Sequence, residues 1–492
     1  MLFNSYEFIF AFLPITFIIY YYLNYKRLTE ASKGFLVFSS LFFYSWWNVL
    51  YLPLILTSML FNYLIGNILA KKKNVTLKLP KKVILLFGII CNLLLLVYFK
   101  YTDFLIENFN FVFNSEVELF HLALPLAISF FTFQQIAYLV DSYRNETKEY
   151  DLLNYAVFVT FFPQLIAGPI VHHKEMMPQF AHNKTKVINY KNIATGLFIF
   201  SIGLFKKVII ADTFSVWAIA GFDTATTLNL FEAWATSLSY TFQLYFDFSG
   251  YSDMAIGLAL LFNIKLPMNF NSPYKATNIQ DFWRRWHITL SRFLRDYVYI
   301  PLGGSKKGNF RTYNNLMATF VLGGLWHGAG WTFLFWGFLH GLALSIRRLW
   351  QSLGFKLWAW VAWLITFNFV NLAWVFFRAK EWEDAIKVLK GMFGLSGIIL
   401  PQFLSTKLVF LEDYSIHFGG WLKALDNEHG GKLIILFLML GFVLVLLFKN
   451  NNRRITEFNL NSKLLFFSIL LFVTSILSLI TNKSSDFLYF NF

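Results

Sequence analysis

The chain has 492 residues, of which 57% are hydrophobic, 21% are aromatic and only 14% are charged. This composition, with a mean hydropathy of +0.53, excludes a soluble globular protein and predicts one integral-membrane domain over residues 1–492, because a soluble fold needs more polar surface. The net charge of +15 does not indicate nucleic-acid binding, since Lys and Arg gather in loops between apolar segments, as the positive-inside rule predicts for cytoplasmic loops.

The first part of the chain contains four apolar segments, each long enough to cross a hydrocarbon layer of about 30 Å. They lie near 8–25, 34–50, 52–70 and 83–101. The loop after the first segment and the loop after the third are basic, whereas the loop after the fourth carries acidic residues and no Lys or Arg. Basic loops in the cytoplasm place the N-terminus outside a bacterial cytoplasmic membrane.

Two apolar segments follow, near 121–141 and 153–170. Basic residues occupy the loops on both sides of the second, so a full crossing would place four lysines outside. We therefore expect a re-entrant segment that turns back at Gly168-Pro169, where a helix is easily broken. The alternative is a complete crossing whose outer loop violates the charge bias.

A span near 193–211 is followed by one near 231–263, and the second carries the polar motif Phe246-Asp-Phe-Ser-Gly-Tyr-Ser-Asp253 in its middle. We expect this motif to break the helix. Polar side chains inside an apolar helix need partners or water. Asp247 and Asp253 either cap helix halves and join neighbouring helices, or line a substrate tunnel, and both interpretations fit the residues.

The least hydrophobic long stretch, 265–311, carries nine Lys and Arg residues against two Asp. Within it, residues 279–297 are expected to form one amphipathic helix at the cytoplasmic interface, with aromatic side chains along one face. Its arginines either attract anionic lipid headgroups or form a basic rim that receives an anionic donor, such as the phosphates of coenzyme A. These residues alone support both interpretations.

The segment 320–336 places an ionisable imidazole, His327, in an apolar and aromatic run with four glycines around it. Glycine allows close approach of backbones and interrupts helices, so the segment predicts a hydrophobic hairpin that turns inside the membrane. An ionisable side chain at that depth indicates a functional site, although a neutral histidine bonded to a helix carbonyl is the structural alternative. His340, thirteen residues later, is expected to be structural.

The last part of the chain adds a span near 357–377 and a mixed segment, 378–400, that we leave unassigned. An acidic segment at 401–431 is expected outside, before two final spans that flank a basic cytoplasmic loop. These spans lie near 433–448 and 463–481. The predicted fold is therefore an all-α polytopic membrane protein with about 10–12 membrane segments, including re-entrant hairpins, around a central tunnel.

His287 and His327 are the two histidines that folding could bring together at mid-depth under aromatic cover. A neutral imidazole can take a proton from a hydroxyl, which makes it a natural base for acyl transfer to an alcohol. The sequence contains no G-x-S-x-G, P-loop or H-E-x-x-H motif. The histidines also lack the spacing of metal ligands, so no metal site is expected.

Several long motifs resemble the membrane-bound O-acyltransferase family, and more closely its bacterial branch of alginate and peptidoglycan O-acetyltransferase-like proteins. They are Phe246–Asp253, Asn269–Tyr274, Phe282–Ser291, Leu294–Gly304 and Gly323–Gly328. The motif-dense region spans 246–341, and the topology, the length and the aromatic ending 487–492 extend the resemblance over the whole chain.

The resemblance implies that an acyl donor enters from the cytoplasm, that an acceptor enters from the outer side, and that a tunnel joins them at a catalytic histidine. That histidine maps onto His327, which we expect to be the general base, and a second family histidine maps onto His287, which orients or assists. Further candidates for lining the substrate path are Asp247, Asp253, Asn271, Arg284, Arg285 and Trp326.

The implied donor is acetyl-CoA, as a substrate rather than a bound cofactor, and the alternative donor is an acyl carrier protein. The implied acceptor is an exported polysaccharide, alginate-like or peptidoglycan, reached through a secreted or periplasmic acetyltransferase partner. D-alanyl transfer to teichoic acid is the alternative within the family. A polysaccharide or ion transporter is the alternative outside it, but a transporter predicts paired halves, and the chain has one motif-dense region.

Overall fold

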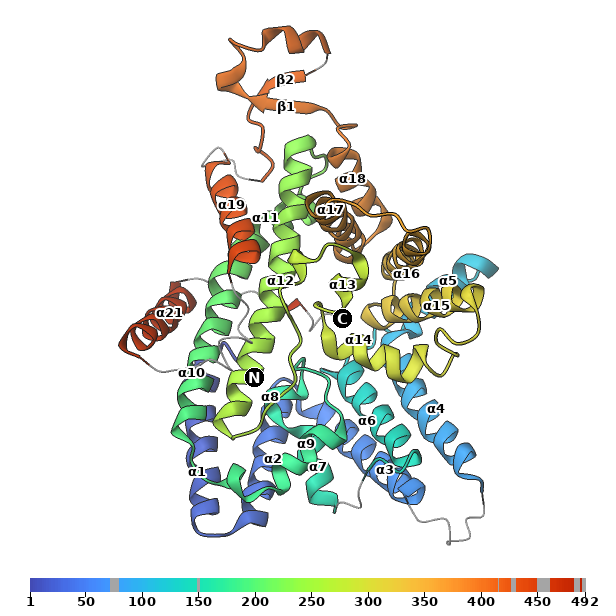
Figure 1. Cartoon of the computed structure of the whole chain (residues 1–492), viewed down its shortest axis with the longest axis vertical. Helices are drawn as coiled ribbons and strands as arrows, with labels where there is room; N and C mark the ends of the chain where they lie inside the picture. Colours follow the sequence, from blue (N-terminus) through green and yellow to red (C-terminus); the bar gives the residue numbers. More distant parts are fainter. Residues whose placement is uncertain are drawn as a thin grey trace.

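The computed structural model describes residues 1–70, 79–147, 151–414, 416–425, 431–448, 461–481 and 487–488; helices joined by loops make up most of them, with one short pair of strands (Figure 1). The helices of the first half are α1 (Leu13–Tyr25), α2 (Thr29–Ser45), α3 (Leu52–Ala70), α4 (Lys81–Lys100), α5 (Thr102–Phe113), α6 (Ile128–Tyr143), α7 (Leu152–Thr160), α8 (Phe162–Leu165), α9 (His173–Ala181), α10 (Tyr190–Phe205) and α11 (Asp212–Ile219). Those of the second half are α12 (Leu230–Leu261), α13 (Ile279–Trp283), α14 (Ile288–Leu294), α15 (Asn309–His327), α16 (Trp331–Ser352), α17 (Ala359–Arg378), α18 (Trp382–Met392), α19 (Lys432–Leu447) and α21 (Ser462–Thr481).

The prediction of an all-α polytopic membrane protein is confirmed. Among the described residues, six helical stretches are long and apolar enough to cross a membrane. They are Glu7–Tyr25, Val49–Ala70, Lys81–Lys100, Tyr190–Thr224, Ala359–Arg378 and Ser462–Thr481. The long stretch from Tyr190 is continuous because π-helical segments, Lys206–Ala211 and Ala220–Thr224, join α10 and α11 and extend them.

Helix α12 corrects the expected break at the polar motif, because it runs without interruption from Leu230 to Leu261. The glycines of α12 allow close contact with α10 and do not bend the helix. A Cβ on Gly250 would lie 2.8 Å from the Gly203 carbonyl oxygen, and one on Gly257 would lie 2.6 Å from the Gly196 carbonyl oxygen. Small residues at such a crossing let two backbones approach closely, and α10 and α12 accordingly run side by side (Figure 1).

The single amphipathic helix expected over 279–297 is also wrong. Helix α13 ends at Trp283, and α14 begins at Ile288 after a turn in which His287 has a φ of +42°. The strand-like segment before α13 holds this turn, since Asn271 N–H donates to the Arg285 carbonyl and Ile288 N–H donates to the Asn269 carbonyl. The aromatic face therefore packs into the core rather than against lipid.

The segment expected to be re-entrant forms a nine-residue helix, α7, that ends at Thr160. Nine residues rise about 13 Å, which is less than half of a hydrocarbon layer, so α7 is too short to cross. The helix is interrupted at Phe161, ahead of Pro163, and the chain turns again at Gly168, where a Cβ would lie 2.4 Å from the Gln164 Cα.

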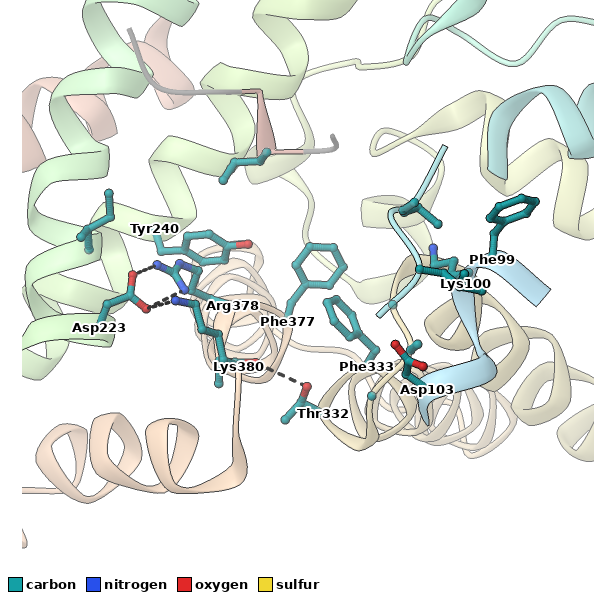
Figure 2. A pocket seen from close by; sticks show the side chains of 18 of the residues that line it. Phe99, Lys100, Asp103, Asp223, Tyr240, Thr332, Phe333, Phe377, Arg378 and Lys380 are labelled. Carbon is teal, nitrogen blue, oxygen red and sulfur yellow. Dashed lines mark hydrogen bonds and ion pairs between the residues drawn. The ribbon is translucent and has the colours of Figure 1, made fainter. Parts of the chain in front are cut away.

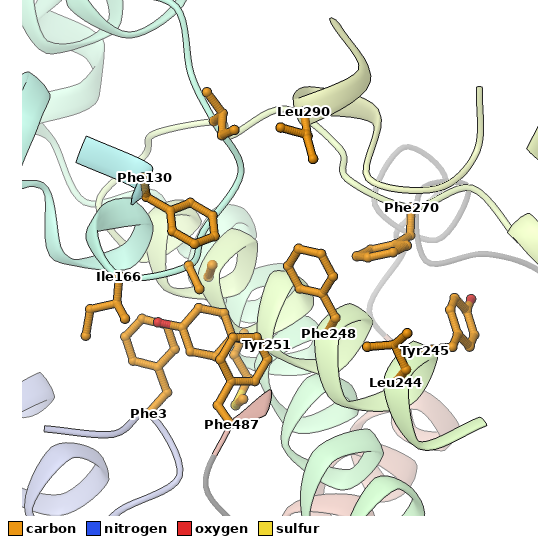
Figure 3. Packing of buried hydrophobic residues seen from close by; sticks show 14 of the residues in the cluster. Phe3, Phe130, Ile166, Leu244, Tyr245, Phe248, Tyr251, Phe270, Leu290 and Phe487 are labelled. Atoms are coloured by element: carbon orange, nitrogen blue, oxygen red, sulfur yellow. The ribbon is translucent and has the colours of Figure 1, made fainter. Parts of the chain in front are cut away.

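The unassigned segment 378–400 contains α18 and β1 (Ile398–Pro401), which pairs in parallel with β2 (Ile416–Gly419) and projects beyond the start of α12 (Figure 1). Near the C-terminus, Phe487 lies in the centre of the bundle, where its ring stacks on that of Tyr251 with the centroids 4.4 Å apart (Figure 3). The predicted basic loops at 71–78 and 449–454 and the aromatic residues 489–492 lie outside the described residues.

Candidate active site

His327 is the last residue of α15, and the three residues 328–330 turn the chain into α16. The predicted hairpin is thus present. Its arms are held close by glycines, because a Cβ on Gly324 would lie 2.3 Å from the Phe333 carbonyl oxygen and one on Gly337 would lie 2.3 Å from the Phe320 carbonyl oxygen. The His327 side chain is 2% exposed, so the hairpin presents its imidazole to the interior of the protein.

Aromatic side chains from three helices enclose the His327 ring. The ring centroids of Trp326, Trp336 and Phe377 lie 4.9, 5.2 and 5.0 Å from that of His327, and all three rings meet it edge to face. The His287 ring lies 6.4 Å away, which confirms that the two predicted histidines come together. Apolar walls of this kind exclude water from the space between the two imidazoles.

Asn269 determines which nitrogen of His287 carries the proton. The Asn269 side-chain oxygen accepts a hydrogen bond from the Thr289 backbone N–H at 3.3 Å, so the atom at this position must be an acceptor. The same oxygen lies 3.0 Å from His287 Nδ1, which therefore donates. In the neutral ring the lone pair is then on Nε2, the nitrogen suited to accept a proton.

The side-chain amine of Lys100, the last residue of α4, closes the carboxyl end of α15. Its Nζ donates to the carbonyl oxygens of Trp326 at 2.5 Å and His327 at 3.2 Å. The neighbouring Tyr101 hydroxyl donates to the Leu325 carbonyl at 2.6 Å. Helix ends leave carbonyls without partners, so these two donors hold the helix terminus that presents His327.

A cavity of about 710 Å³ opens beside this helix end (Figure 2). It is lined by the hairpin turn 328–330, by Lys100 and by Phe377, whose ring also contacts His327. Its far side carries the ion pairs of Asp223 with Arg378 and with Lys380, the second at 3.5 Å. The cavity therefore combines a charged side with an aromatic wall shared with the buried histidine.

The remaining predicted site residues have other neighbours. Asp247 pairs with Lys207 at 2.8 Å, and Asp253 pairs with Lys206 at 2.6 Å, so both carboxylates join α12 to the segment after α10. Arg285 pairs with Asp281 on its own turn. Arg284 and Asn271 are exposed, and Trp326 alone of these candidates lies against both histidines.

Sequence reasoning missed three residues at the site. Asn269, rather than Asn271, contacts His287, and the signal was present because both belong to one motif. Lys100 ends an apolar run, and Asp103 three residues later offers it a local partner, so the sequence gives no signal that it reaches α15. Phe377 has no distinguishing pattern among the 61 phenylalanines of the chain.

Replacing Lys100 by Met should lower the acyl-transfer rate by roughly tenfold, since the hydrogen bonds to the α15 carbonyls are lost while the apolar stem remains. The measurement is the turnover rate and the apparent Michaelis constant of purified protein. Lys81→Met is the matched control, because Lys81 begins the same helix and donates to the Leu69 carbonyl at 2.7 Å, far from the histidines. Equal rates in the two variants would contradict a positioning role for Lys100.

Comparisons with known proteins find similar membrane acyltransferases. The model of the membrane-bound O-acyltransferase (MBOAT) family matches residues 141–380. The chain is 49% identical to a peptidoglycan O-acetyltransferase of Helicobacter pylori over 100% of its own length and 98% of the relative. It is 40% identical to a probable alginate O-acetylase of Pseudomonas aeruginosa over 84% of its own length and 78% of the relative. It is also 29% identical to a teichoic acid D-alanyltransferase of Bacillus subtilis over 52% and 69%.

Proposed function

This chain belongs to the membrane-bound O-acyltransferase family and is an acyltransferase, and on that premise we propose its donor, its acceptor and its direction of transfer. It passes an acetyl group from acetyl-CoA on the cytoplasmic side to an extracytoplasmic polysaccharide. The observation that carries the proposal is the pair of buried imidazoles, 6.4 Å apart, beside Phe377, whose ring contacts His327 and also lines a cavity that carries charged residues.

The charge distribution supports the direction. Basic residues lie just before α15, near the end of α16 and just before α17. Among them are Lys307, Arg347 and Lys356, respectively. The positive-inside rule puts these ends in the cytoplasm. The opposite ends of the same helices, including the turn 328–330 and Arg378, then face the outside, so the cavity is the acceptor side. The same rule puts the N-terminus outside a bacterial cytoplasmic membrane.

The chemistry follows from the two imidazoles. The acceptor oxygen attacks the thioester carbonyl, His327 takes the hydroxyl proton, the carbon–sulfur bond breaks, and the proton then passes to the departing thiolate. Asn269 holds His287 with its proton on Nδ1, so that Nε2 keeps its lone pair. His287 then orients the acceptor or assists His327 in the proton transfer. The aromatic enclosure excludes water, so that the thioester is transferred rather than hydrolysed.

Two relatives guide the choice of acceptor, because their names specify O-acetylation of peptidoglycan and of alginate. The acceptor hydroxyl is therefore a sugar hydroxyl of such a polysaccharide, or a hydroxyl of a secreted acetyltransferase that completes the transfer. D-alanyl transfer to teichoic acid remains the second candidate, since that relative covers about half of this chain.

The test supplies acetyl-CoA labelled in its acetyl group to inverted membrane vesicles that contain the protein and enclosed cell-envelope polysaccharide. We expect label on the polysaccharide, dependent on the protein and independent of any added acyl carrier protein. Label delivered only from a charged carrier protein would replace the donor. Label from D-alanine instead of acetyl would replace the acyl group and support the second candidate.

A further inference from the structure

A second cavity, also of about 710 Å³, lies at the other ends of α16 and α17. Its walls are the second half of α16, the first half of α17 and the residues just before α13, which neighbour one another in the bundle (Figure 1). The lining is mainly apolar, with Leu339, Leu342, Ile346, Ile365 and Phe369 along the two helices. We call this cavity the α16–α17 groove.

The mouth of the α16–α17 groove is cationic. Arg347 and Lys356 line it, and no Asp or Glu occurs anywhere between Asp296 and Glu381. Within the part of the chain that the structure describes, the buried Nε of Arg347 has no hydrogen-bond acceptor. A guanidinium and an ammonium that line one cavity, with no ion pair to a carboxylate of the described residues, attract an anion, and Arg is especially suited to phosphate.

Tryptophans mark the depth of this mouth. Trp350 lines the groove, and Trp358 and Trp360, at the start of α17, are 75% and 63% exposed. Trp is enriched where hydrocarbon meets the headgroup layer, and long Arg and Lys side chains extend to the same level. The cations therefore lie at headgroup depth. Leu339 on α16 and Phe369 on α17 lie deeper, more than one helical turn from the cations along their helices.

From these observations we infer that the α16–α17 groove binds an anionic phospholipid, with its phosphate at Arg347 and Lys356 and an acyl chain along the apolar walls. A volume of this size is in the range of small-molecule sites. The bound lipid sets the spacing of α16 and α17, the helices that bring Trp336 and Phe377 against His327. This inference is independent of the donor and acceptor proposed above.

Native mass spectrometry of the purified full-length protein tests the site, with phosphatidylglycerol as the anionic probe and phosphatidylcholine as the probe without net charge. Wild-type protein should retain phosphatidylglycerol preferentially. Arg347→Gln should weaken retention about fivefold and the double variant Arg347→Gln/Lys356→Gln about 30-fold, because each interfacial cation contributes a similar factor. Ala343→Trp fills the groove without altering charge and should also lose the lipid.

Arg348→Gln is the matched control, since it removes the same charge from the next residue, which does not line the groove. It should change retention by less than about twofold. Equal losses from Arg347→Gln and Arg348→Gln, or equal retention of the two lipids by wild-type protein, would overturn the inference. Displacement of phosphatidylglycerol by coenzyme A would also overturn it, because the groove would then belong to the acyl donor. Unchanged elution on size-exclusion chromatography verifies that each variant is folded.

Discussion

Replacing His327 by Ala should lower acetyl transfer by about 100-fold to 10,000-fold, the usual contribution of a general base. The imidazole is buried at the end of α15, its ring centroid lies 6.4 Å from that of His287, and Phe377 separates it from the cavity beside the hairpin turn. Transfer of labelled acetyl groups to polysaccharide, normalised to the amount of inserted protein, measures the effect. His327→Gln should lose as much activity, because an amide of similar polarity cannot take up the proton.

His173→Gln is the matched control for His327→Gln. The His173 side chain is equally buried, at 2% exposed, but its ring packs on Tyr138 and Phe158, away from the histidine pair. This variant should retain activity per folded molecule. Full transfer by a folded His327→Ala protein would show that the imidazole is structural, in which case the hairpin and its glycines would have to be explained by packing alone.

Replacing Lys207 by Met should destabilise the protein by about 3–5 kcal/mol, because it leaves a buried carboxylate without its cation. The Lys207 and Asp247 side chains are 3% and 2% exposed, and their atoms lie 2.8 Å apart. Asp247 also accepts a hydrogen bond from the Leu488 backbone N–H at 3.1 Å, so the same pair holds the end of the chain inside the bundle. Thermal unfolding in detergent, followed by the melting temperature, measures the loss.

The neighbouring pair supplies the comparison. Lys206→Met removes the same side chain from the pair with Asp253, whose members are 18% and 13% exposed, and should cost less because water reaches the remaining carboxylate. The double variant Lys207→Met/Asp247→Asn should recover part of the loss, since no uncompensated charge is left at Asp247. A double variant less stable than Lys207→Met alone would contradict the assignment of Asp247 as a partner of Lys207.

Hydrophobic segment length could be predicted closely from the sequence. The span expected at 52–70 corresponds to α3 without a shift, and those at 83–101 and 463–481 correspond to α4 and α21 within two residues. Apolar runs of this length have one stable arrangement in lipid, because a helix satisfies its own backbone hydrogen bonds. The His327 hairpin was predictable for the same reason, together with its glycines.

The sequence does not show whether glycines and polar residues within a helix will interrupt it or contact a neighbouring helix. The polar motif on α12, which includes Gly250, suggested a break, yet Gly250 and the later Gly257 are contact points for α10, which exist only once the two helices are packed. Asp247 and Asp253 had two open interpretations, and the lysines that follow α10 decided in favour of helix partners. A single chain pattern does not say which distant backbone or charge will lie opposite it.

The sequence by itself determined the membrane class, the places of the long apolar spans and the two histidines, because these depend on local hydrophobicity and on rare ionisable residues at membrane depth. Only the tertiary structure decided how the histidines are held. Asn269, from the segment before α13, holds His287, whereas Lys100 from the end of α4 and Phe377 from α17 meet at the end of α15. These contacts depend on the relative positions of segments that are distant in the sequence, which no local pattern specifies.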